Sequence, residues 1–198
     1  MTIKPWTKLG KPEILAEGYR KNLSRQVFTD HTGHRQDFYF FEGVDWSVIL
    51  AVTSSGKIVM VRQFKQGSDS ISEEIPGGSL DSNQEETGVV ASRELKEETG
   101  YTPSKIIPLG NFWLDSRSSH TIGHLFLGEN CTRSTSPTPD QDEQTEVFLV
   151  SFKELILKIT KNPSNHRTEA LALMRAFPHL KKRYQWQIIW AFIGLMFK

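Results

Sequence analysis

Apolar and aromatic positions alternate with polar ones in two short stretches near the N-terminus. The stretches 19–28 and 36–41 flank the polar segment 30–33, which has the composition of a tight turn. This pattern predicts an antiparallel β-hairpin. Residues 38–41 are all aromatic, which is more than one strand can place on a single face. Packing within the core is one explanation for the surplus, and a second subunit that covers it is the other.

The next apolar runs predict a second set of strands, followed by helices. Residues 46–52 and 57–63 flank a turn at 54–56 and predict a buried hairpin. Polar loops are expected at 67–72, 115–120 and 128–145. Further strands are predicted at 106–113, 123–127 and 146–151, and helices at 153–160 and 167–177, the latter ended by Pro178. This order predicts an α+β fold in which a mixed sheet carries helices on its faces.

The last residues combine a basic start with an apolar run. Lys181, Lys182 and Arg183 precede the apolar segment 188–197. That segment has about half of the roughly 20 residues that a membrane-spanning helix requires. An interfacial helix with tryptophans and a basic flank is one interpretation. The favoured interpretation is a helix that packs on its own domain or on a second subunit.

Composition excludes several classes of function. The chain has 198 residues and a net charge of +1, which gives no electrostatic reason to expect nucleic-acid binding. Its single cysteine, Cys131, excludes an internal disulfide and a cysteine-based zinc site. The first residues lack the apolar core of a signal peptide, so we expect a cytoplasmic protein.

An acidic cluster marks the helix predicted between residues 83 and 100. Asn83 is the predicted N-cap, with Glu86 three residues later, and Gly100 is the predicted end. Glu94 and Glu98 are four residues apart and share one helical face, with Glu97 beside them. Mg²⁺ prefers such oxygen ligands, and Glu85 and Arg93 are placed to brace them. A solvated acidic face is the alternative.

This segment resembles the Nudix box. The match covers Glu85 and then, after seven residues, the stretch from Arg93 to Tyr101. One departure precedes it, because six residues rather than the family's five separate Gly78 from Glu85. An inserted loop residue is the preferred explanation, and Ser79 in the glycine position is the alternative. The resemblance implies a Nudix fold, with Mg²⁺ (Mn²⁺ as a substitute) held by Gly77, Glu94, Glu97 and Glu98.

The rest of the chain resembles the ADP-ribose pyrophosphatase branch of that family. The segment 62–65 is similar to the branch's Arg-Gln-Tyr-Arg, with Lys65 in place of the second arginine. The segment 74–78 is similar to its Glu-Leu-Pro-Gly-Gly. The resemblance implies substrate contacts by Arg62, Lys65, Glu74 and Trp46. It also implies three parts: a dimerising N-terminal extension (1–44), a hydrolase domain (45–180) and the C-terminal tail (181–198).

The catalytic residues that the resemblance implies are Glu94, Glu98 and Arg93, together with Glu143 from the acidic loop before strand 146–151. Gln141 occupies a position where the branch often has a glutamate, and an amide cannot accept a proton. The base is therefore Glu143, Asp142 or a carboxylate of the box helix, unless metal ions alone activate the water.

The implied reaction is metal-dependent cleavage of a nucleoside diphosphate joined to another group, such as ADP-ribose to AMP and ribose 5-phosphate. Two alternatives stay open. One is a hydrolase with a broader range of nucleotide sugars, and the other is a Nudix-fold regulator that binds nucleotides without hydrolysing them. The loop 115–120 is expected either to touch the terminal sugar or to be a solvated turn.

Overall fold

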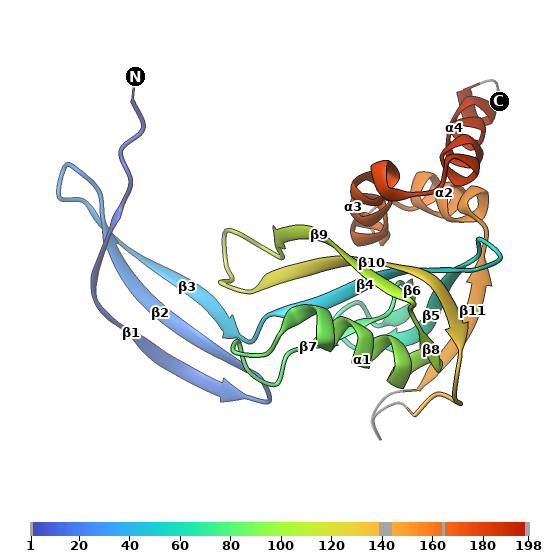
Figure 1. Ribbon diagram of the computed structural model, residues 1–198. Coiled ribbons are helices and arrows are strands. Elements are labelled where there is room, and N and C mark those ends of the chain that lie inside the picture. The colour runs from blue at the N-terminus through green and yellow to red at the C-terminus, as the bar shows by residue number, and fades with distance from the viewer. Residues whose placement is uncertain (1, 139–143, 164, 197–198) are drawn as a thin grey trace.

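The chain folds into two β-sheets with helices on the larger one, and a computed structural model describes residues 2–138, 144–163 and 165–196. The N-terminal sheet is antiparallel, has the order β1-β2-β3 and extends away from the rest of the molecule (Figure 1). Its strands are β1 (Thr7–Gly18), β2 (Lys21–Thr29) and β3 (Arg35–Gly43). The predicted hairpin is β2 and β3, and Asp30 closes its turn by accepting hydrogen bonds from the backbone amides of Thr32 and His34.

β1 is a strand that the sequence pattern did not predict. Eleven of its 12 residues are exposed, on both faces, so no alternation of buried and exposed positions marks it. It pairs with β2 from Thr7 to Gly18, with two interruptions of the register. The predicted hairpin is therefore part of a three-stranded sheet.

Contacts between β3 and the loop 115–120 fix the N-terminal sheet to the main body. The amide of Phe41 donates a 2.8 Å hydrogen bond to the carbonyl of Ser118. His120 stacks on Phe40 with 4.8 Å between ring centroids, and its Nδ1 lies 3.0 Å from Oε2 of Glu42. Residues 115–117 of this loop form an exposed turn, as one of the two alternatives expected, and residues 118–120 make the contacts with the N-terminal sheet.

The larger sheet is mixed, as predicted. Its main path is β11-β5-β4-β10-β8, with β6 paired to β5, β7 to β4 and β9 to β10. β10 runs parallel to β4, and the other pairs are antiparallel. The strands are β4 (Trp46–Thr53), β5 (Ile58–Lys65), β6 (Ser70–Glu74), β7 (Gly77–Ser79), β8 (Tyr101–Thr102), β9 (Lys105–Trp113), β10 (Ile122–Arg133) and β11 (Thr145–Val150). Two predicted loops were too long, because β6 begins at Ser70 and β10 continues to Arg133.

Helices cover both faces of this sheet, which confirms the predicted α+β class. α1 (Thr87–Thr99) lies on one face, and α2 (Phe152–Lys161), α3 (Arg167–Ala176) and α4 (Lys182–Met196) lie on the other (Figure 1). A short 3₁₀ turn, Phe177–His179, joins α3 to α4. β4 is buried on both faces because it is central and covered by helices on each side.

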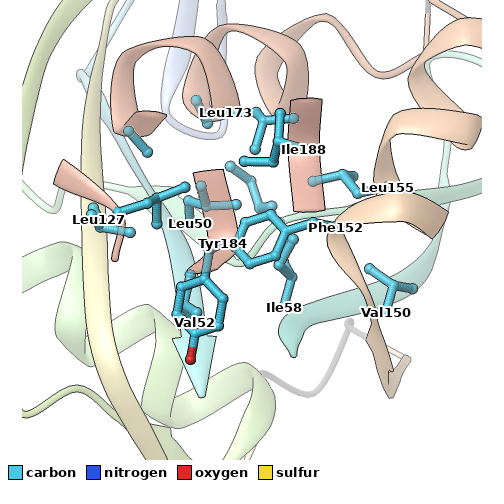
Figure 2. Close-up of a cluster of buried hydrophobic side chains, with 14 of the residues drawn as sticks. Leu50, Val52, Ile58, Leu127, Val150, Phe152, Leu155, Leu173, Tyr184 and Ile188 are labelled. Atoms are coloured by element: carbon cyan, nitrogen blue, oxygen red, sulfur yellow. The ribbon is translucent and has the colours of Figure 1, made fainter. Parts of the chain in front are cut away.

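The sheet separates two hydrophobic clusters. The larger lies under α2, α3 and α4, where Phe152, Leu155, Tyr184 and Ile188 pack near Leu50 (Figure 2). The smaller joins α1 to the opposite face of the sheet through Ile49, Ala51, Val59, Ala91, Leu95, Phe126 and Cys131. Burial raises the pKa of the Cys131 thiol to about 12, so this cysteine is a core residue.

The predicted start of α1 was wrong. The helix begins at Thr87, and the carboxylate of Glu86 accepts a 2.8 Å hydrogen bond from the amide of Val89 as the N-cap. Asn83 instead accepts a 2.8 Å hydrogen bond from the amide of Asp45, which ties the loop before α1 to the start of β4. The predicted end is confirmed, since Gly100 has φ of 76° and its amide donates to the carbonyl of Lys96.

The C-terminal tail forms α4 and packs on its own domain. Tyr184, Ile188 and Ala191 are buried in the larger cluster, and α2 is the main neighbour of the helix. No helix in the described ranges is long and apolar enough to cross a membrane.

Candidate active site

The loop between β6 and β7 is held from both faces of the sheet. The amide of Gly77 donates a 3.0 Å hydrogen bond to Oε2 of Glu98 on α1. The amide of Ile75 donates a 3.0 Å hydrogen bond to Oε1 of Glu169 on α3. Between them, the carbonyl of Pro76 accepts from the amide of Ile49 on β4. Helices on opposite sides of the sheet therefore fix one short loop.

Both positions of this loop require glycine because atoms of β4 and α1 lie where a Cβ atom would be. A Cβ at Gly77 would overlap the carbonyl oxygen of Ser47 and the side chain of Val48 on β4. A Cβ at Gly78 would overlap the carboxylate of Glu94 on α1. The loop backbone consequently lies directly against the acidic face of α1.

Glu94 and Glu98 lie on the face of α1 that approaches this loop. The side chain of Glu94 is 14% exposed and Glu98 as a whole is 4% exposed. Burying carboxylates is costly unless cations or hydrogen bonds compensate. Their burial against glycine backbone excludes the alternative of a solvated acidic face.

Arg93 supplies the positive charge nearest to these carboxylates. Its Nη1 lies 2.9 Å from Oε1 of Glu94 and 2.9 Å from Oε2 of Glu97, which are the contacts expected of a bracing residue. Burial lowers the pKa of Arg93, but the charges of Glu94 and Glu97 raise it by more, so the guanidinium stays charged. Its Nη2 is buried and has no hydrogen-bond partner in the part of the chain that the structure describes.

These residues fit a divalent cation by their chemistry. Three carboxylates on adjacent turns of α1 offer oxygen ligands, which Mg²⁺ and similar ions prefer. Among the described residues, no three acidic, histidine or cysteine side chains are already arranged around one point. Arg93 accounts for part of this, because one nitrogen bridges Glu94 and Glu97. A cation that bound there would compete with this bridge.

Glu85 lies before the helix, not on it as predicted. Its carboxylate accepts hydrogen bonds from the amides of Asp81 and Ser82, at 2.5 and 3.4 Å. Glu85 therefore closes the loop 81–85. It braces the loop rather than the carboxylates of Glu94 and Glu98.

The residues expected to contact substrate sit at the ends of neighbouring strands. Arg62 on β5 lies 2.8 Å from Glu73 and 2.6 Å from Glu146, and its guanidinium covers the ring of Phe148. Lys65 at the end of β5 lies 3.2 Å from Glu74 at the end of β6.

Two predicted site residues remain, Trp46 and Glu143, and the structure describes the first of them. Trp46 opens β4 and is paired with Ser79 on β7 and with Gly123 on β10. Glu143, the predicted base, lies outside the described residues, as do Gln141 and Asp142.

A groove runs along the outer side of α1. It has a volume of about 940 Å³ and is bordered by Arg93, Glu97, Pro108, Asn111 and Phe126. This volume is in the range of small-molecule sites, and the groove reaches the charged residues of α1.

Glu169 on α3 is a functional candidate that the sequence motifs did not indicate. It is 2% exposed and shares the buried face of α3 with Ala172, Leu173 and Ala176. The spacing of the apolar residues along this helix could have indicated it, because Glu169 occupies a position where the helical repeat predicts a buried apolar residue. His166 lies beside it, also buried, with Nδ1 3.8 Å from Oε2 of Glu169.

A second group of polar side chains, also not predicted from the sequence, links the start of β4 to β9 and β10. Nε2 of His124 lies 3.0 Å from Asp45, and its Nδ1 lies 3.0 Å from Oδ1 of Asn111. Asp45 also accepts a hydrogen bond from the amide of Ile122 and donates its own amide to Asn83. These contacts fix the starts of β4 and β10 and the loop before α1. Nothing in the spacing of these residues along the chain indicated that they meet.

Comparisons with known proteins agree with this geometry. The ADP-ribose pyrophosphatase of Bacillus subtilis is 38% identical over 109 residues, which cover 54% of this chain and 58% of that protein. The methanol dehydrogenase activator of Bacillus methanolicus is 30% identical over 109 residues, with the same coverage of both chains. The chain thus spans a little under three fifths of the length of these relatives. A crystal structure of an ADP compounds hydrolase superposes with a TM-score of 0.75 at 17% identity, over 92% of this chain and 98% of that one, which shows the shared fold.

The family model of the NUDIX domain matches residues 41–172, which include the sheet, α1 and the loop at Gly77 and Gly78. The resemblance seen in the sequence is thereby confirmed, and the chain belongs to the Nudix family.

Proposed function

We propose that this protein hydrolyses the diphosphate bond of a nucleoside diphosphate joined to another group, with ADP-ribose as the preferred substrate and AMP and ribose 5-phosphate as products. The observation that carries the proposal is the pairing of Glu94 and Glu98 on α1 with the backbone of Gly77 and Gly78. Carboxylate oxygens held beside glycine backbone are the kind of ligand that a hard divalent cation prefers, and such a cation also binds the oxygens of a diphosphate.

A divalent cation is part of this proposal, since Nudix hydrolases generally use divalent metals. Mg²⁺ is proposed, with Mn²⁺ as a substitute, and Glu94, Glu97, Glu98 and the carbonyl of Gly77 as its ligands. When bound, such an ion neutralises charge on the diphosphate and lowers the pKa of water. Arg93 holds Glu94 and Glu97 in place until the ion competes for them.

The remaining roles follow the positions of the side chains. Arg62 and Lys65 are proposed to contact phosphate, which requires each to exchange a carboxylate partner for the substrate. Trp46 and Glu74 are proposed to contact the rest of the substrate. Glu143 is proposed as the base, and the variant Glu143→Gln tests it through the dependence of turnover on pH.

ADP-ribose is preferred because the relative from Bacillus subtilis is named for it. A broader hydrolase of nucleotide sugars is the second candidate, since the groove beside α1 is wide enough for several of them. A regulator without hydrolytic activity is the third, and the relative named as an activator of a dehydrogenase favours including it.

Product release from a panel of nucleoside diphosphate compounds separates these candidates. AMP formed from ADP-ribose with Mg²⁺ or Mn²⁺ and not with EDTA, well above other substrates, is the expected result. Similar rates on several nucleotide sugars would favour the broader hydrolase. Nucleotide binding without turnover would favour the regulator.

The variant Glu98→Gln tests the site itself. Because the amide oxygen of glutamine can still accept the hydrogen bond from Gly77, the fold should persist. Turnover should nevertheless fall by at least about 100-fold, since an anionic ligand is lost. Glu17→Gln, which makes the same change on the exposed strand β1, is the control. Unchanged turnover in Glu98→Gln would refute the metal assignment.

We also propose a cytoplasmic homodimer with three parts, residues 1–44, 45–180 and 181–198. The N-terminal sheet supports the dimer, because Tyr39 and Phe41 share one of its faces and each is about half exposed. A reducing compartment fits the free, buried thiol of Cys131.

A further inference from the structure

α4 has an outer face that is rich in exposed aromatic side chains. Trp186 is 58% exposed and Trp190 is 65% exposed, and they lie four residues apart on one side of the helix. The opposite side, with Tyr184 and Ile188, is buried in the domain (Figure 2). The tryptophans are therefore not needed for the core, and they are held outward on a helix that the core fixes.

A groove runs beside these tryptophans, between α4, α2 and the turn from β4 to β5. Its volume is about 720 Å³. Leu157 and Leu195 line it together with the two tryptophans, and Lys57, Lys153 and Arg183 are its charged residues. Its lining residues, all of which the structure describes, include no aspartate or glutamate. An apolar groove with a purely cationic set of charges is thus continuous with the exposed aromatic face.

The charge of the whole C-terminal region has the same sign. No aspartate or glutamate follows Glu169 in the sequence, whereas residues 181–198 include four lysines and arginines. Arg183 donates to the carbonyl of Ser54, and Lys181 to the side chain of Asn130. Within the described part of the chain, none of the four basic residues Lys57, Lys153, Lys182 and Arg183 forms a close ion pair with a carboxylate. The carboxylate of Glu154 on α2 is near enough to Lys57 for that charge to help lower the Glu154 pKa.

We propose that α4 and this groove form a docking surface for a bilayer that contains anionic lipids, with α4 lying along the membrane surface. Tryptophan side chains favour the interface between headgroups and acyl chains. Amphipathic helices with such residues and basic flanks bind there, and each lysine or arginine near an anionic surface adds about 1 kcal/mol.

The charges favour a lipid surface over a second copy of the chain as the occupant. Two copies that met through α4 would place two surfaces with the same cationic residues, Lys57, Lys153 and Arg183, against each other. Like charges in such a contact repel. An anionic bilayer instead offers phosphate groups to the cations and apolar depth to the tryptophans.

Vesicle binding tests the proposal with the full chain. Vesicles of phosphatidylcholine alone are compared with vesicles in which about one third of the lipid is phosphatidylglycerol, by co-sedimentation and by tryptophan fluorescence. We expect at least about tenfold tighter binding to the anionic vesicles, a blue shift of the fluorescence, and weakening at high salt. Equal binding to both vesicle types, or binding to neither, overturns the proposal.

Two pairs of variants locate the surface. Trp186→Ser/Trp190→Ser removes the aromatic face, and Trp113→Ser, which alters a tryptophan that is 56% exposed on β9, is its control. Lys153→Glu/Lys182→Glu reverses two charges, and Lys11→Glu/Lys105→Glu is its control at exposed positions elsewhere. Each variant of the proposed surface should weaken binding to anionic vesicles about tenfold while its control does not.

The unfolding temperature of every variant is measured beside the vesicle assay. Equal losses in variants and controls would overturn the assignment to α4. So would a self-association that the α4 tryptophan variant abolishes, because it would identify a second copy as the occupant.

Discussion

A side chain at Gly77 and a side chain at Gly78 would meet different groups. Substitutions at the two positions should therefore differ in how far they affect stability and how far they affect activity. At Gly78 a methyl group would meet the carboxylate of Glu94, the end of a flexible side chain that can move aside. We expect Gly78→Ala to cost less than about 1 kcal/mol of unfolding free energy and to lower turnover at least about tenfold, because Glu94 is displaced. Thermal unfolding and steady-state kinetics measure the two effects.

Gly77→Ala is the matched comparison. There the methyl group would meet the backbone carbonyl of Ser47 and the side chain of Val48 inside the sheet, which cannot move aside cheaply. We expect a loss of about 1–3 kcal/mol in unfolding free energy. If Gly78→Ala were as destabilised as Gly77→Ala, or kept full activity, the proposed contact with Glu94 would be wrong.

At this scale the sequence predicted the acidic residues better than their surroundings. The four-residue spacing of Glu94 and Glu98 was enough to place both on one face of α1, since helical geometry is local. The contacts of Arg62 with Glu73 and Glu146 were not predictable, because they join three strands through sheet register. Glu169 could have been found as a glutamate on an apolar face, but its partner Ile75 is 94 residues away.

Glu169 couples α3 to the loop that faces α1 on the other side of the sheet. Glu169→Ala would leave the buried amide of Ile75 without its acceptor, and we expect a loss of about 1–3 kcal/mol in unfolding free energy. The loop would loosen next to Gly77, so the Mg²⁺ concentration for half-maximal turnover should rise. Glu169→Gln keeps an acceptor and should lie between Glu169→Ala and the natural protein.

Ile156→Val separates loop positioning from a general loss of stability. It removes one methyl group from the core under α2 and should cost about 1 kcal/mol without touching the loop. Its Mg²⁺ requirement should be unchanged. An increase equal to that of Glu169→Ala would mean that Glu169 acts only through stability.

Glu73 connects β6 to two other elements by charge. Its carboxylate contacts Arg62 on β5 and Lys158 on α2. Burial raises its pKa, but the hydrogen bonds from Lys158 and Arg62 lower it by more, so its pKa in the folded protein is below the ordinary value of 4.5. The unfolded chain therefore binds the proton more readily, and stability from this group is present above pH 4.5 and lost on acidification.

Glu73→Gln should consequently be less stable than the natural protein at pH 7, by about 1 kcal/mol, and the difference should shrink as the pH falls below about 4.5. Urea unfolding between pH 3 and 7 measures it, with Glu17→Gln on the exposed strand β1 as the control. A difference that stays constant or grows towards low pH would contradict the assigned direction of the pKa shift.

Elements with a regular alternation or a marked end were predicted, and those without were not. β4, β5 and the end of α1 at Gly100 followed from apolar runs and a terminal glycine. β1 was missed because its exposed residues carry no alternation. The start of α1 was misplaced because Asn83 and Glu86 had the spacing of a cap, whereas Asn83 bonds to Asp45, far away in sequence.

At the scale of the whole molecule, the N-terminal sheet has one aromatic face that the single chain leaves uncovered. Tyr39 and Phe41 are two residues apart on β3, so they share one face, and both are more than half exposed. Loop 115–120 holds the base of the sheet but covers neither ring. Phe38 and Phe40 lie on the other face and contact Phe28 and His120 within the chain. A second chain that covered Tyr39 and Phe41 would account for the other two aromatic residues of the run.

We therefore expect the protein to elute in light-scattering chromatography as a dimer of about 45 kDa, twice the chain mass of 22.6 kDa. Tyr39→Glu/Phe41→Glu places two charges in the proposed interface and should shift the protein to a monomer at micromolar concentration, because buried unpaired charges are costly. Met174→Glu/Leu149→Glu alters exposed apolar residues on α3 and β11 and should leave the dimer intact. A monomeric natural protein would refute the dimer, and a dimer that survives Tyr39→Glu/Phe41→Glu would place its interface elsewhere.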